Sequence, residues 1–396
     1  MPNPYYPRPF SGEPRLTKDW LTTINLLLRG GHSTNGHNGH KQKVNTLNIY
    51  GCENFYQMAE NAPEATLNCN PNGFLNTLWQ QQPHSTNFGK IAINGKFAML
   101  EFYPTITQNF KHGLFLSLTV PIKHFSVKEL TFFDQTTSIS APNATTYREW
   151  QSFFNNIENN LQPYGVCLGP TKSSGLGDTQ LMGGWTYSYE ETEVLDFIDF
   201  TVALGANIPT SKTVSPYIPL SIPFGFNHPG FPFIGMISCG FFDWLTLGLN
   251  GGFLWLNNKK EFIGMKTTPE QQGLTHLARG CAMVKPGTTW FLDPYIKCDH
   301  LIGGFSLTLG FSYDHANKTT ISPCDQTIFD KTVVNSDERY GDWHMTAFHF
   351  VLDFDFASFK HSWAPRIAFT VDKSMRGKRI FDTALFGAAI TADIEW

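Results

Sequence analysis

The side chains of this chain that could do chemistry stand singly or in pairs along stretches where apolar and polar residues alternate. Asp353 and Asp355 form one such pair, two residues apart. Two neighbouring carboxylates can bind a metal ion or share a proton. Residues two apart on a strand project from the same face, so both side chains would point into one polar interior. We therefore expect them to line a passage, and we expect no catalytic residue in this pair.

The same alternation assigns other charged residues to an inner face. In the stretch 344–356 the residues of one face are all apolar: Phe348, Phe350, Leu352, Phe354 and Phe356. Over all the strand-like stretches, the side chains expected to line the passage are Asp199, Lys297, His349, Asp353, Asp355 and Arg366. Because they carry both signs of charge, they predict a passage without strong selectivity for one charge.

No pattern indicates a metal site, and no cofactor is expected. His32, His37 and His40 lie among Gly, Asn and Ser and could bind a transition metal, but no carboxylate or cysteine supports them. We expect a solvated loop. The seven cysteines include no Cys-x-x-Cys pair. Cys52 and Cys69 flank one polar loop and could form a disulfide in an oxidising compartment, and at least one thiol has no partner within the chain.

An enzymatic function is not indicated either. Some membrane barrels are lipid hydrolases or acyltransferases, and their site would need Ser and His close together on the lipid face, with Asn or Asp behind. His344 and His349 are candidates, but His349 falls on the inner face of its stretch. The chain also lacks the Gly-x-Ser-x-Gly motif of a nucleophile elbow.

The composition favours strands that face lipid. The 396 residues include 35 Phe, 13 Tyr and 10 Trp, whereas charged residues make up only 16%, against roughly 25% in typical globular domains. No run of about eighteen apolar residues predicts a transmembrane helix. The net charge of -4 gives no basic footprint for nucleic acid. If the chain crosses a bilayer, it does so as strands.

The lengths of the connections between strand-like stretches predict a barrel. From residue 124 to residue 361, short turns alternate with long polar loops, the arrangement of outer-membrane barrels. We expect an all-β, closed antiparallel transmembrane barrel of about twelve strands, from 43–51 to 380–396, with fourteen as the alternative. The segment 147–161 has helical spacing and could cover the barrel as a lid or pack on its rim.

The first part of the chain is harder to assign. Residues 20–29 could form a helix or a strand; a strand there would make the count odd unless another was missed within 52–89. We divide the chain into 1–42, a periplasmic or lumen-plugging segment, and 43–396, the barrel. An exported barrel needs a leader, and we expect that one was removed before Pro2.

The last stretch resembles the C-terminal strand of bacterial outer-membrane β-barrels. It ends with apolar residues at every second position, Ile390, Ala392, Ile394 and Trp396. The resemblance implies that the barrel-assembly machinery reads these residues and that the protein lies in the bacterial outer membrane. Its partners would then be the lipid bilayer, the assembly machinery and a small solute.

A second resemblance concerns the strand that follows the longest loop. Ser173-Ser174-Gly175-Leu176-Gly177-Asp178 is similar to a strand start in the outer-membrane channel family of long-chain fatty-acid transporters and of proteins associated with the degradation of phenol-type aromatics. Ser174, Gly175, Gly177 and Asp178 carry this likeness. The Asn-Pro-Ala plug start of the fatty-acid transporters is absent, and Pro2-Asn3-Pro4 is the nearest stretch.

These observations together predict an outer-membrane channel or transporter for the passive uptake of small or hydrophobic solutes. A structural, receptor or adhesin barrel is the alternative, and a barrel lipid hydrolase or acyltransferase is a further one. The solute, the oligomeric state and the source organism are open.

Overall fold

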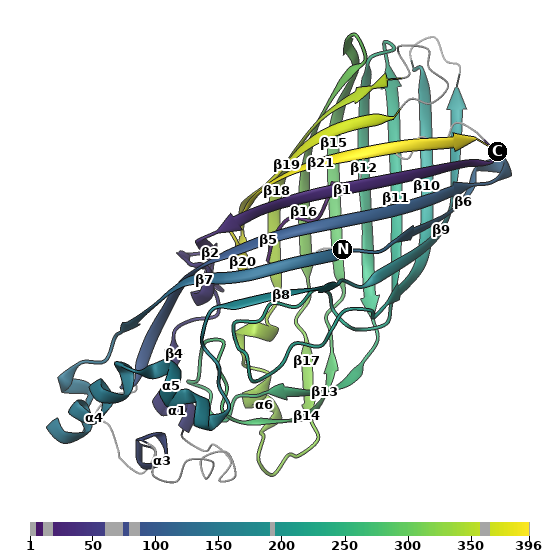
Figure 1. The fold of residues 1–396 in the computed structure, drawn as a ribbon. Helices are drawn as coiled ribbons and strands as arrows, with labels where there is room; N and C mark the ends of the chain where they lie inside the picture. Colours follow the sequence, from purple (N-terminus) through teal and green to yellow (C-terminus); the bar gives the residue numbers. More distant parts are fainter. Residues whose placement is uncertain are drawn as a thin grey trace.

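A closed β-barrel dominates the computed structural model, which describes residues 5–10, 19–59, 74–78, 88–190, 195–356 and 365–395. In this part of the chain, twelve antiparallel strands form the wall (Figure 1). β1 (Leu21–Ser33) closes it by pairing with β21 (Ala384–Glu395) and with β5 (Lys90–Asn109). The other wall strands are β6 (Leu114–Thr119), β9 (Thr179–Glu190), β10 (Phe197–Ile208), β11 (Gly230–Phe241), β12 (Leu245–Leu256), β15 (Thr289–Ile302), β16 (Phe305–Ala316), β18 (Trp343–Asp355) and β19 (Arg366–Lys378).

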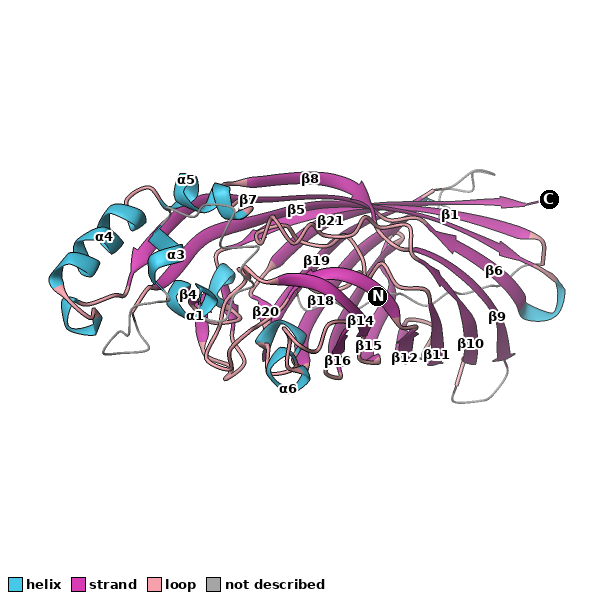
Figure 2. Ribbon diagram, turned by 90° about the horizontal axis from the view of Figure 1, so that it is seen from below, coloured by secondary structure: helices cyan, strands magenta, loops and turns pink. Residues whose placement is uncertain are grey.

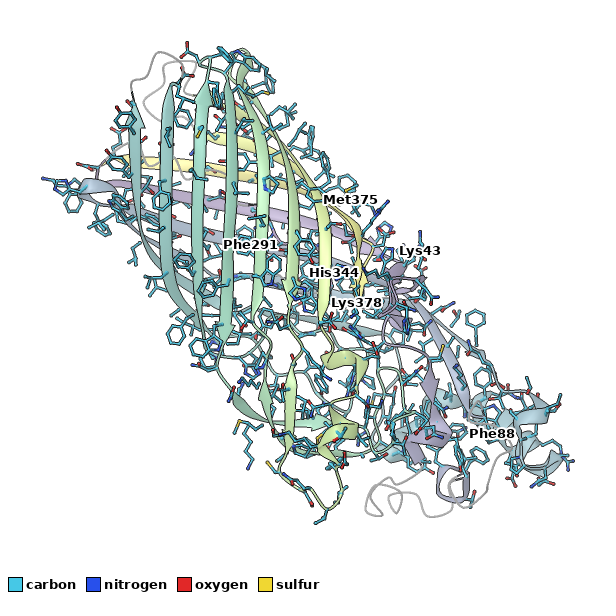
Figure 3. The ribbon with its side chains drawn as sticks, turned by 180° about the vertical axis from the view of Figure 1, so that it is seen from behind. Lys43, Phe88, Phe291, His344, Met375 and Lys378 are labelled. Carbon is cyan, nitrogen blue, oxygen red and sulfur yellow. The ribbon has the colours of Figure 1, made fainter. Side chains whose placement is uncertain are left out.

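The barrel strands alternate between the two sides of the wall, as their sequences predict. On β18, the side chain of Phe348 is 37% exposed on the outside, whereas that of His349 is 0% exposed. Outward aromatic and aliphatic side chains cover the wall at many heights (Figure 3). On β21, Ile390 and Ile394 are exposed and Ala392 is half-buried, while Trp396 lies outside the described residues. This apolar outer face is that of a membrane-spanning barrel.

The connections are sorted by length between the two rims of the barrel. The short turns are 110–113, 191–196, 242–244, 303–304 and 356–365. The long connections at the opposite rim are 34–89, 120–178, 209–229, 257–288 and 317–342, and we call them together the cap. The last outer connection is the one exception to the pattern; it is short and lies at 379–383, later than the 373–379 read from the sequence. The predicted alternation of short and long connections is therefore confirmed.

The cap has secondary structure of its own. Its strands are β2 (Asn35–His37), β3 (Lys43–Asn45), β4 (Glu53–Asn54), β7 (Ile122–Asp134), β8 (Thr171–Leu176), β13 (Lys259–Gly264), β14 (Arg279–Lys285) and β17 (Thr320–Pro323), and β20 (Ile380–Phe381) joins β2. Its helices are α1 (Phe55–Ala59), α3 (Phe74–Leu78), α4 (Ala144–Phe154), α5 (Ile157–Leu161) and α6 (Lys331–Val334). Its short 3-10 turns lie at Thr46–Asn48, Ser138–Ser140, Gln162–Tyr164 and Glu338–Tyr340, and one more, Lys111–Gly113, lies at the short-turn rim. Among the described helices, none has the length and apolar character to cross a membrane.

The first barrel strand is not the predicted one. The segment 43–51 was expected to begin the barrel, but only Lys43–Asn45 is extended, and a 3-10 turn follows it. Asn45 caps that turn by accepting from the backbone N–H of Leu47, which ends the strand (3.1 Å). The first strand is β1, so residues 21–29 are extended and not helical, and Trp20 lies in the turn before them. The strand count stays at twelve because Leu21–Ser33 takes the place of 43–51 as the first strand. The predicted division between a segment 1–42 and a barrel 43–396 is therefore wrong for Leu21–Ser33, which belongs to the barrel.

The helical spacing at 147–161 does produce helices, and they pack away from the lumen. α4 and α5 contribute Trp150 and Leu161 to a buried aromatic and aliphatic core within the cap. Phe88, which Figure 3 shows in the cap at a distance from the barrel, packs on Trp150 with ring centroids 5.8 Å apart. Figure 2 shows these helices at one end of the extended strands β5 and β7. The packed arrangement, and not the lid, is the one that the structure shows.

Candidate functional site: the barrel lumen

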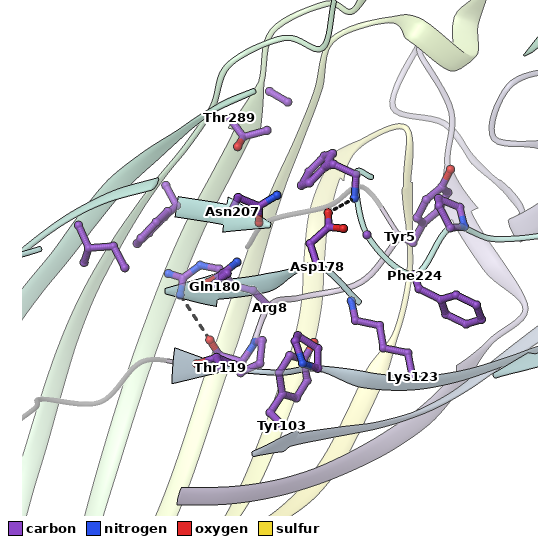
Figure 4. A pocket seen from close by; sticks show the side chains of 18 of the residues that line it. Tyr5, Arg8, Tyr103, Thr119, Lys123, Asp178, Gln180, Asn207, Phe224 and Thr289 are labelled. Atoms are coloured by element: carbon purple, nitrogen blue, oxygen red, sulfur yellow. Dashed lines mark hydrogen bonds between the residues drawn. The ribbon is translucent and has the colours of Figure 1, made fainter. Parts of the chain in front are cut away.

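The barrel encloses a cavity of about 830 Å³. It is lined by inner faces of the wall strands, by cap residues and by the first residues of the chain, among them Tyr5, Arg8 and Asp178 (Figure 4). Much of its wall on β5, β6 and β10 consists of Thr and Ser. These hydroxyl groups pair across strands: Thr105 with Thr119 (3.0 Å) and Thr107 with Ser117 (2.9 Å). Paired neutral hydroxyls leave a surface that is only weakly polar.

The segment of residues 5–10 lies inside the barrel. Tyr6 Oη donates to Glu101 Oε1 on β5 (2.7 Å), and both side chains are buried. Arg8 makes ion pairs with Asp293 on β15 and with Asp314 on β16, where its Nε lies 3.2 Å from Oδ1. Its guanidinium also lies 4.0 Å from the centroid of the Phe291 ring. The beginning of the chain is thus held by inward carboxylates on three strands.

Phe10 continues this contact along the inner wall. Its ring lies 5.2 Å from that of His349 and 5.7 Å from that of Tyr295, measured between centroids. Gly310 on β16 leaves room for it, because a Cβ there would lie 2.6 Å from Phe10 Cε2. A side chain at position 310 would therefore displace Phe10, which gives this glycine a packing role.

A chain of buried charges crosses the wall beside the segment. Arg29 on β1 binds Glu101 on β5 (Nη2 to Oε2, 2.9 Å) and Asp372 on β19 (Nη1 to Oδ2, 2.8 Å). Lys123 Nζ lies 3.3 Å from the other Glu101 oxygen. These four groups are nearly inaccessible to solvent. Their charges balance, so the inner wall has strong local dipoles but no excess of one sign.

Ser312, His349 and Asp372 have the connectivity of a catalytic triad. His349 Nδ1 is 2.7 Å from Asp372 Oδ1, and His349 Nε2 is 2.9 Å from Ser312 Oγ. These residues lack the oxyanion-binding N–H groups that a catalytic triad needs beside its serine. Ser312 is buried within strand β16, and it is not at a helix N-terminus or tight turn, where successive N–H groups converge on an oxyanion. Asp372 is already paired with Arg29. We interpret the three residues as part of the charge chain.

The sequence that resembles the channel family lies at a break in the wall. β6 continues into β7 across Val120 and Pro121, and β8 continues into β9 across Gly177 and Asp178. The two breaks are adjacent, since Gly177 N–H donates to the carbonyl of Pro121 (2.8 Å). Gly175 packs under Phe224, whose Cε2 would be 2.9 Å from a Cβ at position 175. Ser174 Oγ lies 2.6 Å from His124 Nδ1.

Asp178 fastens the connection 209–229 to this break. It is buried, accepts from Ser211 Oγ (2.6 Å), and accepts from the backbone N–H groups of Phe226 (2.7 Å) and Asn227 (3.0 Å). A carboxylate with several N–H and O–H donors is well compensated for burial. The motif therefore positions a cap loop at the mouth of the cavity.

The six residues expected to line the passage fall into two groups. Lys297, Asp353 and Arg366 line the cavity. Lys297 lies 2.6 Å from Asp299 and Arg366 lies 3.6 Å from Asp393, so both have acidic partners. The other three do not line it: His349 belongs to the charge chain, Asp199 accepts from Ser188 Oγ, and Asp355 is half-buried near the short-turn rim.

Sequence reasoning missed the residues that hold the beginning of the chain. Arg8, Asp293 and Asp314 were not singled out, and neither were Arg29 and Glu101. A usable signal existed for three of the five, Asp293, Asp314 and Glu101: each is a charge at an inward position of a strand-like stretch. Arg29 was hidden because 20–29 was not fixed as a strand. Arg8 lies in a Pro-rich stretch without periodicity.

The cap forms a roof over the cavity with a second buried polar cluster. Glu53 accepts from the backbone N–H groups of Leu274 (2.7 Å) and Thr275 (3.0 Å). Burial raises the pKa of Glu53 to about 7, although these two N–H groups act to lower it. His276 Nε2 lies 3.1 Å from Asp337, which Arg339 also contacts. Burial lowers the pKa of His276, with Arg339 acting in the same direction.

Comparison with known proteins places this geometry among outer-membrane channels. A solved outer-membrane channel from Pseudomonas putida F1 aligns with a TM-score of 0.52 at 9% identity, covering 98% of this chain and 100% of that chain. The chain has the fold of an outer-membrane channel. No protein family model and no curated protein matches its sequence.

Two further solved structures are similar more distantly. The monoaromatic hydrocarbon channel CymD aligns with a TM-score of 0.33 at 6% identity, covering 96% of this chain and 89% of that chain. The toluene transporter TodX of P. putida aligns with a TM-score of 0.33 at 8% identity, covering 96% and 91%. At this level of similarity, we base the assignment of function on the lumen itself.

Proposed function

We propose that the protein is a channel of the bacterial outer membrane that takes up small, uncharged or weakly polar solutes by passive diffusion. The observation that carries the proposal is a closed barrel with an apolar outer face around a cavity of about 830 Å³. That volume is in the range of about 300–1,000 Å³ typical of small-molecule sites. A purely structural barrel has no need of such a space.

The lining defines the class of solute. Hydroxyl groups on the inner strands pair with each other, and aromatic rings of Phe10, Phe291 and Tyr295 border the cavity. Six of the seven cationic residues that line the described cavity have an acidic partner, as Lys297 has Asp299 and Arg366 has Asp393; Lys212 is the exception. A solute with a net charge would have to compete with these partners and lose its hydration, whereas a neutral solute would not.

The beginning of the chain narrows the passage. Arg8 and Phe10 extend into the lumen from a segment that crosses it, and both line the cavity. We therefore propose that residues 5–10 form a plug, held chiefly by the Arg8 ion pairs. The deletion that tests this role must end before β1, because removal of residues 1–42 would remove a wall strand.

Uptake into liposomes tests the proposed solute class. Vesicles containing the purified protein should admit small neutral aromatic and sugar-sized solutes. Ions of equal size should enter more slowly than these neutral solutes, and anions and cations should enter at similar rates. A strong preference for one sign of charge would contradict the proposed lining. No uptake of any solute would favour the receptor alternative, for which the structured cap with its own hydrophobic core is the supporting feature.

A further inference from the structure

Two cysteines from different loops of the cap lie opposite each other in one small sheet. Cys281 is in β14, within the connection 257–288, and Cys324 follows β17 directly, within the connection 317–342. β14 and β17 are antiparallel neighbours whose last paired residues are Ala282 and Pro323. The next residues outward on the two strands are the two cysteines.

A backbone hydrogen bond fixes this pairing. The N–H of Cys324 donates to the carbonyl of Cys281 (3.0 Å), so the two residues form a hydrogen-bonded cross-strand pair. The Cα atoms in such a pair are about 5.5 Å apart, within the 4.4–6.8 Å found across disulfides. The backbone is already at the separation that a disulfide needs.

The side chains also project to the same face. Directly opposite residues of an antiparallel pair point to one side of the sheet. The neighbouring Ala282 and Pro323 are buried on the other side, whereas Cys281 and Cys324 are both exposed. Both thiols are therefore accessible to an oxidant from solvent and close to each other.

We propose that Cys281 and Cys324 form a disulfide that joins two loops of the cap. The proposal rests on the outer-membrane location proposed above, because both sides of that membrane are oxidising. The oxidant is a small or protein disulfide. One cysteine thiolate attacks it, which forms a mixed disulfide and releases one thiol, and the second thiolate then attacks the protein sulfur and releases the other thiol. Two electrons pass to the oxidant, and two protons end on its thiols.

The link reinforces a weak part of the cap. β17 is held to β14 by four residue pairs, from Ala282 with Pro323 to Lys285 with Thr320. On its other side β14 pairs with β13, so the disulfide would tie β17 to the β13–β14 pair within one three-stranded unit over the cavity. Val284 of this unit lines the cavity. The disulfide therefore restrains the roof over the passage.

Labelling with maleimide-polyethylene glycol tests the proposal on the full chain. The protein is taken from membranes without reductant, or reduced and then treated with glutathione disulfide. In both cases Cys281 and Cys324 should escape labelling until reductant is added, and digestion should give one peptide pair linked through them. In Cys281→Ser taken from membranes without glutathione disulfide, Cys324 should be labelled without reduction.

A matched control separates this pair from general thiol chemistry. Cys167 is also exposed in the cap, and Cys167→Ser should leave the protection of Cys281 and Cys324 unchanged. All variants should retain heat-modifiable migration in SDS, which shows that the barrel is folded. Labelling of both thiols before reduction, even after glutathione disulfide, would overturn the proposal. So would a linked peptide that joins either residue to another cysteine.

Discussion

Arg8 shows how a single residue connects the beginning of the chain to the far side of the barrel. Its partner Asp314 is 306 positions away in the sequence, and both side chains are buried. A buried ion pair contributes little net stability compared with apolar residues, but removal of one partner leaves an uncompensated charge. The main role of Arg8 is therefore to fix the position of residues 5–10 inside the barrel.

Arg8→Ala should destabilise the folded barrel, because Asp293 and Asp314 lose their buried partner. We expect a loss of about 3–5 kcal/mol, measured by urea unfolding in lipid vesicles. Arg148 is exposed on α4, so Arg148→Ala is the control and should be nearly neutral. Equal stability of the two variants would contradict the buried ion pairs.

Glu53 predicts how the stability of the cap depends on pH. Its pKa in the folded protein is raised to about 7 from an ordinary 4.5, so the folded state favours the protonated form. The stability it contributes is complete below pH 4.5 and is lost as pH rises through 7. The buried, neutral His276 has the opposite effect, because its lowered pKa costs stability as pH falls below about 6.5.

Glu53→Gln separates the two contributions. The variant should lack the loss of cap stability between pH 5 and 8, measured by hydrogen exchange of the Leu274 and Thr275 amides. Glu149→Gln, at an exposed position of α4, should keep it. Unchanged pH dependence in the Glu53 variant would show that this carboxyl is not the group that titrates.

At the scale of elements, β18 separates the two environments of the wall most clearly. Leu352 is 37% exposed on the outer face, three residues before the end of the strand. Asp353 lines the cavity on the inner face. Leu352 and Asp353 are adjacent in the sequence, but one faces lipid and the other faces the cavity. Substitutions at these two positions therefore compare the two environments directly.

Leu352→Arg should cost up to about 2–4 kcal/mol, because it places a charge against lipid. Asp353→Ala should cost little, since its carboxylate faces an aqueous cavity. Unfolding titrations of both variants in the same lipid test this order. A larger cost for the aspartate variant would mean that the strand faces are reversed.

The sequence predicted the elements that depend on local pattern. The alternation around Phe348 and His349, the sorting of loop lengths and the helices near Trp150 all follow from residue periodicity. β1 was ambiguous because Trp20, Ile24 and Leu28 fit a helical face as well as a strand. Its pairing with β21 makes this segment a strand. That pairing joins residues more than 350 positions apart, so the local sequence does not show it.

The interior of the site was less accessible to such reasoning. Inward charges such as Asp353 could be recognised on their strands, but their partners could not. The path of residues 5–10 depends on carboxylates contributed by β5, β15 and β16. Periodicity within one stretch carries no information about such contacts between distant strands.

At the scale of the whole molecule, the protein is a barrel whose passage residues 5–10 narrow. The wall supplies an apolar outside and an inside whose charges are mostly paired, the cap roofs one end, and residues 5–10 occupy the lumen. Conductance should therefore be small, and it should show little preference between cations and anions.

Planar-bilayer recording of the full chain beside a variant that lacks residues 2–18 tests this account most directly. The deletion ends before Leu21, so β1 and the closed wall remain. We expect small, weakly selective conductance for the full chain and a larger conductance for the deletion, while Arg148→Ala behaves like the full chain. Equal conductance of the full chain and the deletion would contradict the plug, and no conductance in either would contradict the channel.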